Sequence, residues 1–167
     1  MAQPLKLYFI RHGIAEKRQS HLPDKQRTLT SKSQQKTQKV AQQLQTLGIN
    51  FDYLQTSPLV RAHQTAEIIQ QQGLISAIHV SGLLSPEGNW QDWLNWFQNW
   101  RKQGLKHLAL VGHEPNLSAW AEILVWGQPR QQLVLKKAGM IGLLLPEHHN
   151  PVGQSTLFWL TAPKLLF

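Results

Sequence analysis

The chain has 167 residues, of which 17 are Lys or Arg, 9 are Asp or Glu and none is Cys. Domains usually run to roughly 100–150 residues, so we expect one domain over residues 1–167. With 41% hydrophobic residues, the chain is able to bury a sizeable core. The absence of Cys excludes disulfides, zinc–thiolate sites and a Cys nucleophile, so any catalysis must use Ser, Thr, His or carboxylate side chains.

The amino-terminal segment has no long apolar run and no cleavage site typical of a signal peptide, and no stretch approaches the roughly 18 apolar residues of a membrane span. We therefore expect a cytoplasmic protein that does not insert into membranes. The formal net charge of +8 favours an acidic partner: nucleic acid, a phosphorylated substrate or an acidic protein surface. Because the basic residues form no arginine-rich block and no nucleic-acid-binding motif, nucleic acid is not the expected partner.

The first quarter of the chain predicts a strand, a long loop and a helix. The apolar run at 5–10 is typical of a strand buried on both faces. The polar segment 11–29 predicts a loop of a length that is usually functional in a compact domain. Ser31, with Gln34 three residues later, indicates a capping box at the start of a helix that ends at Gly48.

A second strand and helix follow. The run 51–56 predicts a strand, after which Ser57 as N-cap and Pro58 as first helical residue indicate a new helix. Its buried stripe is predicted to consist of Leu59, Ala62, Ala66 and Ile69.

Strands and helices continue to alternate in the second half. We expect a short strand at 77–80, a helix at 90–103, a strand at 106–112 and a helix from Pro115 to Gly127. The helix at 90–103 has an aromatic stripe whose spacing is far more typical of core than of a ligand cage, and it consists of Trp90, Trp93, Phe97 and Trp100.

The last third predicts two strands, 139–145 and 156–162, separated by a turn-rich segment and therefore antiparallel. The whole pattern indicates an α/β fold: a three-layer α/β/α sandwich with a central, mostly parallel sheet and an antiparallel C-terminal strand pair. In such folds, ligands bind at the carboxyl ends of the strands.

Three motifs follow predicted strands at this edge of the sheet. The first is Arg11-His12-Gly13, the second is the run 57–65, which contains Arg61, and the third is the pair 112–113, which ends in His113. Each has a plain structural alternative when taken alone. A strand-end His often bonds a backbone carbonyl, and Arg61 lies off the apolar stripe of its helix, as a solvent-facing Arg does.

Taken together, the motifs suit one reaction. A neutral imidazole is a competent phosphoryl acceptor, so His12 is able to form a phosphohistidine intermediate. Arg11 and Arg61 supply planar, permanently charged donors to phosphoryl oxygens, and His113 adds a further donor where charge develops. This chemistry requires no metal and no other cofactor.

The motifs resemble those of the histidine phosphatase superfamily: an Arg-His-Gly after the first strand, then Ser-Pro-Leu-x-Arg-Ala-x-Gln-Thr, then a late Gly-His. Here they occupy 11–13, 57–65 and 112–113, and the resemblance covers the chain from about residue 6 to about residue 160. It implies a phosphoglycerate mutase-like fold without large insertions. It also implies that His12 is the nucleophile, that Arg11, Arg61 and His113 complete the phosphate pocket, and that Gly13 and Arg27 contact substrate.

The short length is similar to that of SixA-type phosphohistidine phosphatases. This resemblance implies a metal-independent protein phosphatase, monomeric, that acts on the phosphorylated histidine phosphotransfer (HPt) domain of a hybrid sensor kinase in two-component signalling and releases inorganic phosphate. Larger members place a general-acid Glu between the positions of Arg61 and His113. Of the acidic residues in that interval here (Glu67, Glu87 and Asp92), Glu87 is the best candidate, with a solvated turn carboxylate as the alternative.

Two other functions stay open at this point. A phosphomonoesterase of a small metabolite would need Glu87 or another donor to protonate its alkoxide leaving group. A non-catalytic phosphoprotein-binding module would retain the pocket but would not need a histidine nucleophile. The other histidines, His21, His63, His79, His107, His148 and His149, have no motif context and are interpreted as surface residues.

Overall fold

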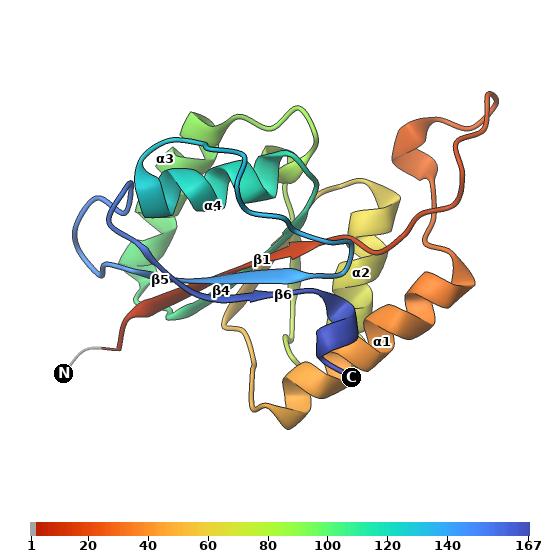
Figure 1. Ribbon diagram of the computed structural model, residues 1–167, viewed down its shortest axis with the longest axis horizontal. Helices are drawn as coiled ribbons and strands as arrows, with labels where there is room; N and C mark the ends of the chain where they lie inside the picture. Colours follow the sequence, from red (N-terminus) through yellow and green to blue (C-terminus); the bar gives the residue numbers. More distant parts are fainter. Residues whose placement is uncertain (1–2) are drawn as a thin grey trace.

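The computed structural model describes residues 3–167. Within this range six strands form one sheet in the order β3-β2-β4-β1-β5-β6. Helices lie on both sides of this sheet (Figure 1). The bounds of the strands are β1 (Leu5–Arg11), β2 (Tyr53–Thr56), β3 (Ile78–Val80), β4 (His107–Gly112), β5 (Met140–Leu145) and β6 (Thr156–Thr161). All six of the predicted strands are therefore present.

The sheet is parallel on one side and antiparallel on the other. β1 pairs in parallel with β4, β4 with β2, and β2 with β3. β5 runs antiparallel to both β1 and β6, which confirms the predicted C-terminal pair. The carboxyl ends of β1, β2 and β4 consequently lie at one edge of the sheet.

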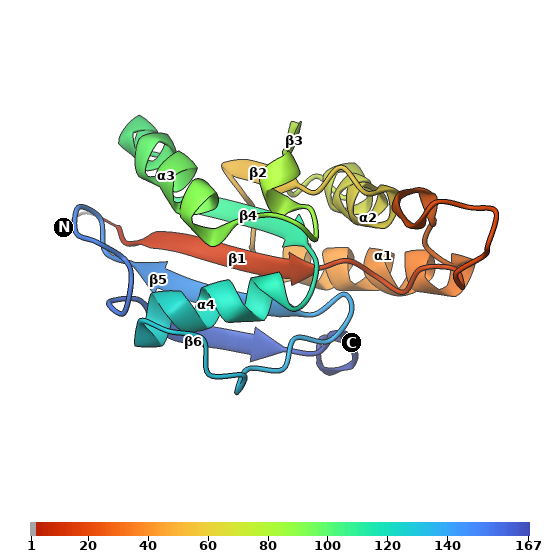
Figure 2. The same cartoon turned by 90° about the horizontal axis from the view of Figure 1, so that it is seen from above.

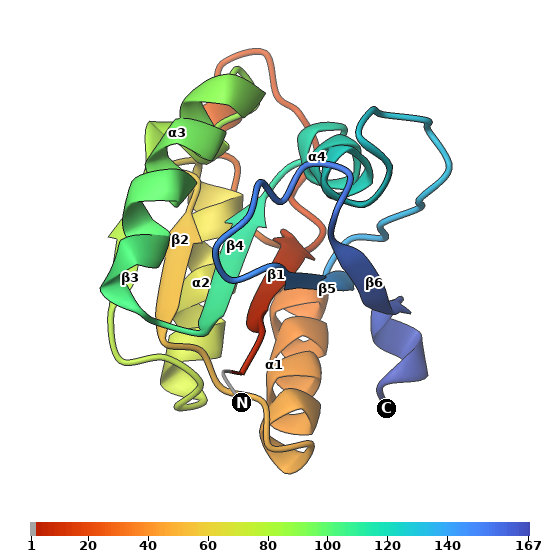
Figure 3. The ribbon, with the colours of Figure 1, turned by 90° about the vertical axis from the view of Figure 1, so that its left-hand side faces the viewer.

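Four α-helices cover the two faces of the sheet, as the end-on view in Figure 3 shows. α1 (Ser31–Thr46) and α2 (Val60–Gln71) pack on one face, and α3 (Trp90–Trp100) and α4 (Asn116–Trp126) pack on the other. Alternate residues of β1 enter the two cores: Leu7 and Phe9 face α3 and α4, whereas Tyr8 and Ile10 face α1 and α2. The predicted three-layer sandwich is therefore confirmed.

The aromatic stripe of α3 is core, as predicted. Trp93 and Phe97 are fully buried and stack with ring centroids 5.3 Å apart. The Trp93 indole N–H donates to the side-chain oxygen of Gln55 in β2 at 3.2 Å, so its one polar atom is satisfied. Trp100 is also buried and Trp90 partly buried, and both pack in the same core cluster.

Two helix starts differ from the sequence-based expectation. The N-cap of α1 is Thr30, whose hydroxyl oxygen accepts the backbone N–H of Ser33 at 3.0 Å, so Ser31 is already the first helical residue. α2 begins at Val60, and Ser57 does not cap it. The Ser57 hydroxyl instead accepts the N–H of Leu59 at 3.2 Å in the turn before the helix, where it faces the site described below.

The predicted long loop separates β1 from α1 and contains one short 3₁₀ helix, η1 (Asp24–Gln26). Its two limbs are joined by a bridge between Ala15 and Leu29. Figure 2 shows the loop extending beyond the carboxyl ends of the strands, next to α2. None of the helices within residues 3–167 is long and apolar enough to cross a membrane.

Candidate active site

The parallel sheet brings the three motifs together. Arg11 at the end of β1 is in register with Gly112 at the end of β4, and the N–H of His12 donates to the Gly112 carbonyl at 3.1 Å. As a result, the rings of His12 and His113 lie with their centroids 5.0 Å apart. The carboxyl edge predicted from the sequence is thus the place where both histidines meet.

His12 is buried and held in one tautomer. Its Nδ1 lies 2.6 Å from the carbonyl oxygen of Gly13. Because a carbonyl only accepts, Nδ1 must carry the proton, and the lone pair of a neutral ring is then on Nε2. Burial, followed by the charges of nearby cationic groups, lowers the pKa of His12 to about 3 despite the Gly13 bond, which favours the charged form. The His12 imidazole is therefore neutral at physiological pH.

Gly13 fixes this geometry from within the protein. Its N–H donates to the Thr65 hydroxyl at 3.2 Å, and its carbonyl accepts from His12. A Cβ at this position would collide with the Oγ of Ser33. Both of its backbone polar groups are used within the protein, where its carbonyl orients His12, and the expected contact of Gly13 with substrate stays a prediction.

His113 is buried beside Ser57. Its Nε2 lies 2.7 Å from the Ser57 hydroxyl oxygen. A hydroxyl group both donates and accepts, so this contact fits a proton on either ring nitrogen of His113. Within the described residues Nδ1 has no hydrogen-bond partner. Burial and then the charge of Arg61 lower the pKa of His113 to about 4, so this histidine is also neutral.

Each of the two arginines has a buried Nε–H without a hydrogen-bond partner in the described residues. Arg11 donates through Nη1 to the Leu135 carbonyl at 3.0 Å, and its buried Nε has no partner within residues 3–167. Arg61, in the first turn of α2, is only 5% exposed, so the solvent-facing alternative is wrong. Arg61 lies off the apolar stripe of α2, on the side of the helix that the loop after β1 covers. The covered side is buried, so Arg61 does not face solvent. The buried Nε of Arg61 likewise has no partner in the described chain.

A carboxylate that sequence reasoning missed binds both Arg61 and Arg27. Asp24 accepts from Arg61 Nη1 through its backbone carbonyl at 3.0 Å and from Nη2 through its carboxylate at 3.1 Å. The same carboxylate lies 2.8 Å from Arg27. Burial opposes ionisation, but the bond to Arg27 and the charge of Arg61 outweigh it and lower the pKa of Asp24. The only sequence signal was an acidic residue three positions before Arg27 in a long loop.

Arg27 is joined to the site through Asp24. Its Nη1 donates to the Glu16 carbonyl at 2.9 Å, and the expected contact of Arg27 with substrate stays a prediction. A second residue that the sequence analysis missed is Lys137, in the turn before β5. Partial burial and then the charges of three arginines lower its pKa, and these are Arg11, Arg27 and Arg61.

Glu87 stands apart from these groups. It is exposed in the turn after η2 (Gly82–Leu84), and within the described chain it forms no hydrogen bond or ion pair. The turn is tied to the start of α4 by Asn116, whose amide donates to the carbonyls of Ser85 and Pro86. The structure thus ties this turn to the start of α4, and within the described residues no hydrogen bond or ion pair joins Glu87 to His12 or His113.

The carboxylates close to the site are already engaged. Burial lowers the pKa of Arg11, and the charge of Glu114 opposes this effect. Glu114 accepts from both the backbone and the hydroxyl of Ser118. Asp24 is ion-paired with three arginines, Arg18, Arg27 and Arg61. Within residues 3–167 no group of three or more His, Asp or Glu side chains is arranged to hold a metal ion.

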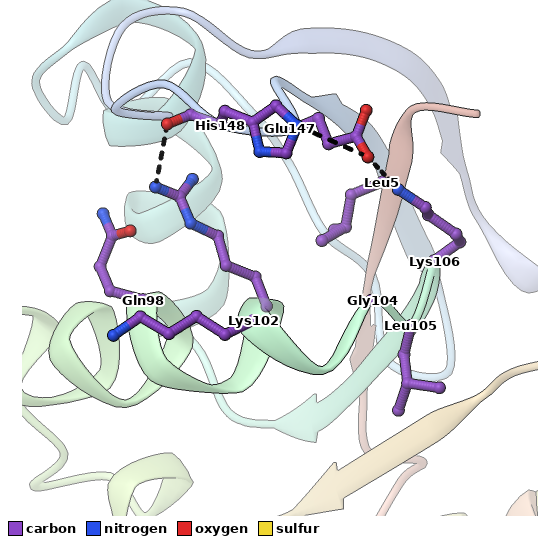
Figure 4. A pocket seen from close by; sticks show the side chains of 9 residues that line it. Leu5, Gln98, Lys102, Gly104, Leu105, Lys106, Glu147 and His148 are labelled. Carbon is purple, nitrogen blue, oxygen red and sulfur yellow. Dashed lines mark hydrogen bonds and ion pairs between the residues drawn. The ribbon is translucent and has the colours of Figure 1, made fainter. Parts of the chain in front are cut away.

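A different hollow of about 390 Å³ lies at the opposite, amino-terminal edge of the sheet (Figure 4). Its charged groups are satisfied within the protein: Lys106 pairs with Glu147 at 2.8 Å, and Arg101 donates to the His149 carbonyl at 2.8 Å. It contains no buried imidazole. The candidate active site is therefore the carboxyl edge, not this hollow.

An α/β sandwich with two buried neutral histidines and two arginines at the carboxyl edge defines a phosphate-handling class of protein. The family model of the histidine phosphatase superfamily (branch 1) matches residues 7–111, which is more than half of the chain. The chain belongs to this superfamily, whose members are hydrolases.

Comparison with other proteins agrees with this membership. An uncharacterized protein of Picosynechococcus sp. is 42% identical, and the match covers 97% of this chain and 99% of that protein. The structure of the protein histidine phosphatase SixA complexed with tungstate has a TM-score of 0.85 at 22% identity, covering 98% of this chain and 100% of that one. Phosphoserine phosphatase of Entamoeba histolytica has a TM-score of 0.71 at 21% identity, covering 98% and 100%. These similar structures share the phosphoglycerate mutase-like fold that was expected.

Proposed function

We propose that this protein is a phosphohistidine phosphatase that hydrolyses its substrate through a phospho-His12 intermediate. The observation that carries this proposal is a neutral, oriented His12 that no carboxylate contacts by a hydrogen bond or ion pair within the described residues. An alkoxide leaving group requires a proton from a positioned acid. A phosphohistidine ring protonated on its other nitrogen departs as neutral imidazole and requires none.

In the first step, the lone pair of His12 Nε2 attacks phosphorus while the substrate's P–N bond breaks. The bonding electrons leave with the substrate imidazole. Three donors without protein partners are available to the phosphoryl oxygens, where charge is held in the transition state: Arg11 Nε, Arg61 Nε and His113 Nδ1 in the tautomer that carries its proton there. Because these donors are fixed by the fold, little reorganisation is required as the reaction proceeds.

In the second step, water attacks phospho-His12 and the new P–N bond breaks. The proton on Nδ1, held by the Gly13 carbonyl, allows His12 to leave as a neutral ring with its lone pair restored on Nε2. The proton lost by the water goes to a phosphate oxygen, and inorganic phosphate is released. Neither step calls for a metal ion, and we propose a metal-independent enzyme.

The substrate we propose is the phosphorylated HPt domain of a hybrid sensor kinase in two-component signalling, met in the cytoplasm by a monomeric enzyme. The net charge of +8 supports an acidic protein partner, and the likeness to the SixA fold supports a phosphohistidine substrate.

The test is parallel turnover of a phosphohistidine protein and a panel of alkyl phosphomonoesters, each with and without a metal chelator. We expect hydrolysis of the phosphohistidine protein in both conditions, poor hydrolysis of the esters, and acid-labile phosphate mapped to His12 after rapid quenching. Preferential hydrolysis of alkyl esters would instead identify a phosphomonoesterase. Tight binding of phosphoprotein without turnover would identify a binding module.

A further inference from the structure

A basic hollow adjoins the candidate active site. It has a volume of about 360 Å³ and shares Arg11 with the phosphate pocket. Its other lining residues come from the loop after β1, from α1, from the turn before β5 and from the carboxyl-terminal segment: Ile14, Lys36, Lys136, Lys137, Ala162, Pro163 and Lys164. Five of the eight lining residues are cationic and none is acidic.

The hollow continues away from the active site over α1. A neighbouring hollow of about 330 Å³ shares Lys36 and Lys164 with the first and adds Lys32 and Lys39. The short helix η4 (Pro163–Leu165) packs against α1, which brings Lys164 to this surface (Figure 1). We call the continuous surface formed by Lys32, Lys36, Lys39, Lys136 and Lys164 the basic groove.

The charge of the basic groove is uncompensated. None of its lysines belongs to any ion pair formed within residues 3–167. The sequence of α1 contains no Asp or Glu, and Glu147 is the one acidic residue after Glu122. Lys32, Lys36 and Lys39 have the spacing of a single helix face, where like charges destabilise the helix. This concentration of positive charge opposes folding of the isolated protein. We attribute it to an anionic partner.

The extent of the groove favours a protein as that partner. Lys32 and Lys39 are about 10 Å apart along α1. Both lie outside the hollow that adjoins Arg11. Exposed apolar side chains flank the lysines, with Ile14 46% and Phe167 52% exposed. Apolar contacts inside a polar rim are typical of a protein interface, whereas a small polyanion would use the cations alone.

We propose that the basic groove binds an acidic surface of the protein that carries the phosphohistidine, beside the residue to be dephosphorylated. This inference rests on the proposed function, since it assigns the groove to the same substrate. The groove increases the rate of productive encounter and holds the partner while its phosphohistidine enters the pocket next to Arg11.

The experiment compares two phosphohistidine peptides of equal length, one with Glu and one with Ser flanking the phosphohistidine. The test variant is Lys36→Glu with Lys164→Glu, and Lys36→Gln with Lys164→Gln is a milder second variant. The control is Lys102→Glu with Arg130→Glu, which changes the net charge equally at two exposed residues outside the groove. Binding of the unphosphorylated Glu-rich peptide is measured in parallel by fluorescence anisotropy.

For the wild type we expect kcat/KM to be about tenfold higher for the Glu-flanked peptide than for the Ser-flanked one. This ratio should fall to near one in the Lys→Glu test variant, to an intermediate value in the Lys→Gln variant, and stay at the wild-type value in the control. Binding of the unphosphorylated Glu-rich peptide should weaken in the same order.

Equal turnover of both peptides by the wild type would refute the proposed binding of an acidic surface by the basic groove. The proposed phosphatase activity would still hold. If neither peptide were hydrolysed but the groove variants still weakened peptide binding, the groove would stand and the proposed function would fail. A wild-type ratio in the test variant, together with altered inhibition by inorganic triphosphate, would assign the groove to a small polyanion and overturn the protein partner.

Discussion

Substitution of His12 by Asn should reduce the loss of stability that the protein suffers in acid. The folded state holds His12 neutral with a pKa of about 3, whereas the unfolded chain has the ordinary value near 6.5. Between these pH values the unfolded state binds more protons than the folded state. The contribution of neutral His12 to folding stability is therefore fully present well above pH 6.5. This contribution is lost as the pH falls toward 3.

The size of this effect follows from the two pKa values. Each His in this situation contributes a slope approaching about 1.4 kcal/mol per pH unit well below pH 6.5. Between pH 7 and pH 5, His12 should account for about 2 kcal/mol of lost unfolding free energy, and this figure is nearly the same for any folded pKa at or below 4. His113, with its pKa lowered to about 4, should contribute a similar amount.

Urea unfolding followed by fluorescence of the seven tryptophans measures this directly. The wild type and the His12→Asn variant are compared at pH 7 and pH 5. The variant should lose about 2 kcal/mol less than the wild type between these pH values. A His21→Asn variant is the control, because His21 is exposed and should leave the wild-type loss unchanged. Equal losses in the wild type and the His12→Asn variant would show that His12 titrates normally and would refute the derivation of a neutral nucleophile from its burial.

Three further predictions concern the pocket and its neighbours. Arg61→Ala should weaken vanadate inhibition by about 10- to 100-fold, because it removes a charge-assisted donor worth roughly 1.5–3 kcal/mol, and unchanged inhibition would exclude Arg61 from the pocket. Asp24→Asn should weaken vanadate inhibition less than Arg61→Ala does, since the guanidinium keeps its charge but loses the carboxylate that fixes it; tighter inhibition would mean that Asp24 competes with the ligand. Glu87→Gln should retain most of the rate on phosphohistidine because its carboxylate is exposed, whereas a loss of a hundredfold or more would make Glu87 a general acid.

Much of the fold was predictable because local signals and packing agree. β1 has apolar residues on both faces, and the structure buries both. Gly127 ends α4 in the left-handed conformation expected of a helix stop, with φ of 85°. The edge at which His12, Arg61 and His113 meet followed from the rule that parallel strands present their carboxyl ends together.

The rest depended on contacts between segments far apart in the sequence. Ser57 matched a helix N-cap by residue type, yet its hydroxyl contacts His113, 56 residues away. Asp24 carried no motif, and its role arises because the loop after β1 folds over α2, 37 residues further along the chain. Lys137 lies in a turn that no periodicity predicts, and only the docking of β5 beside β1 brings it near Arg11.

The same burial accounts for both the reactivity proposed for the site and its cost to the fold. Removing His12 and His113 from water makes them neutral, which a phosphoryl acceptor such as His12 requires, and it also creates the acid sensitivity predicted above. Arg61 is a buried cation whose charge the Asp24 carboxylate neutralises through Nη2, while Nη1 donates to the Asp24 carbonyl. Its Nε has no partner within the described residues. Asp24 therefore stabilises a buried cation without using all of its donors, and the remaining N–H groups are those suited to an oxyanion.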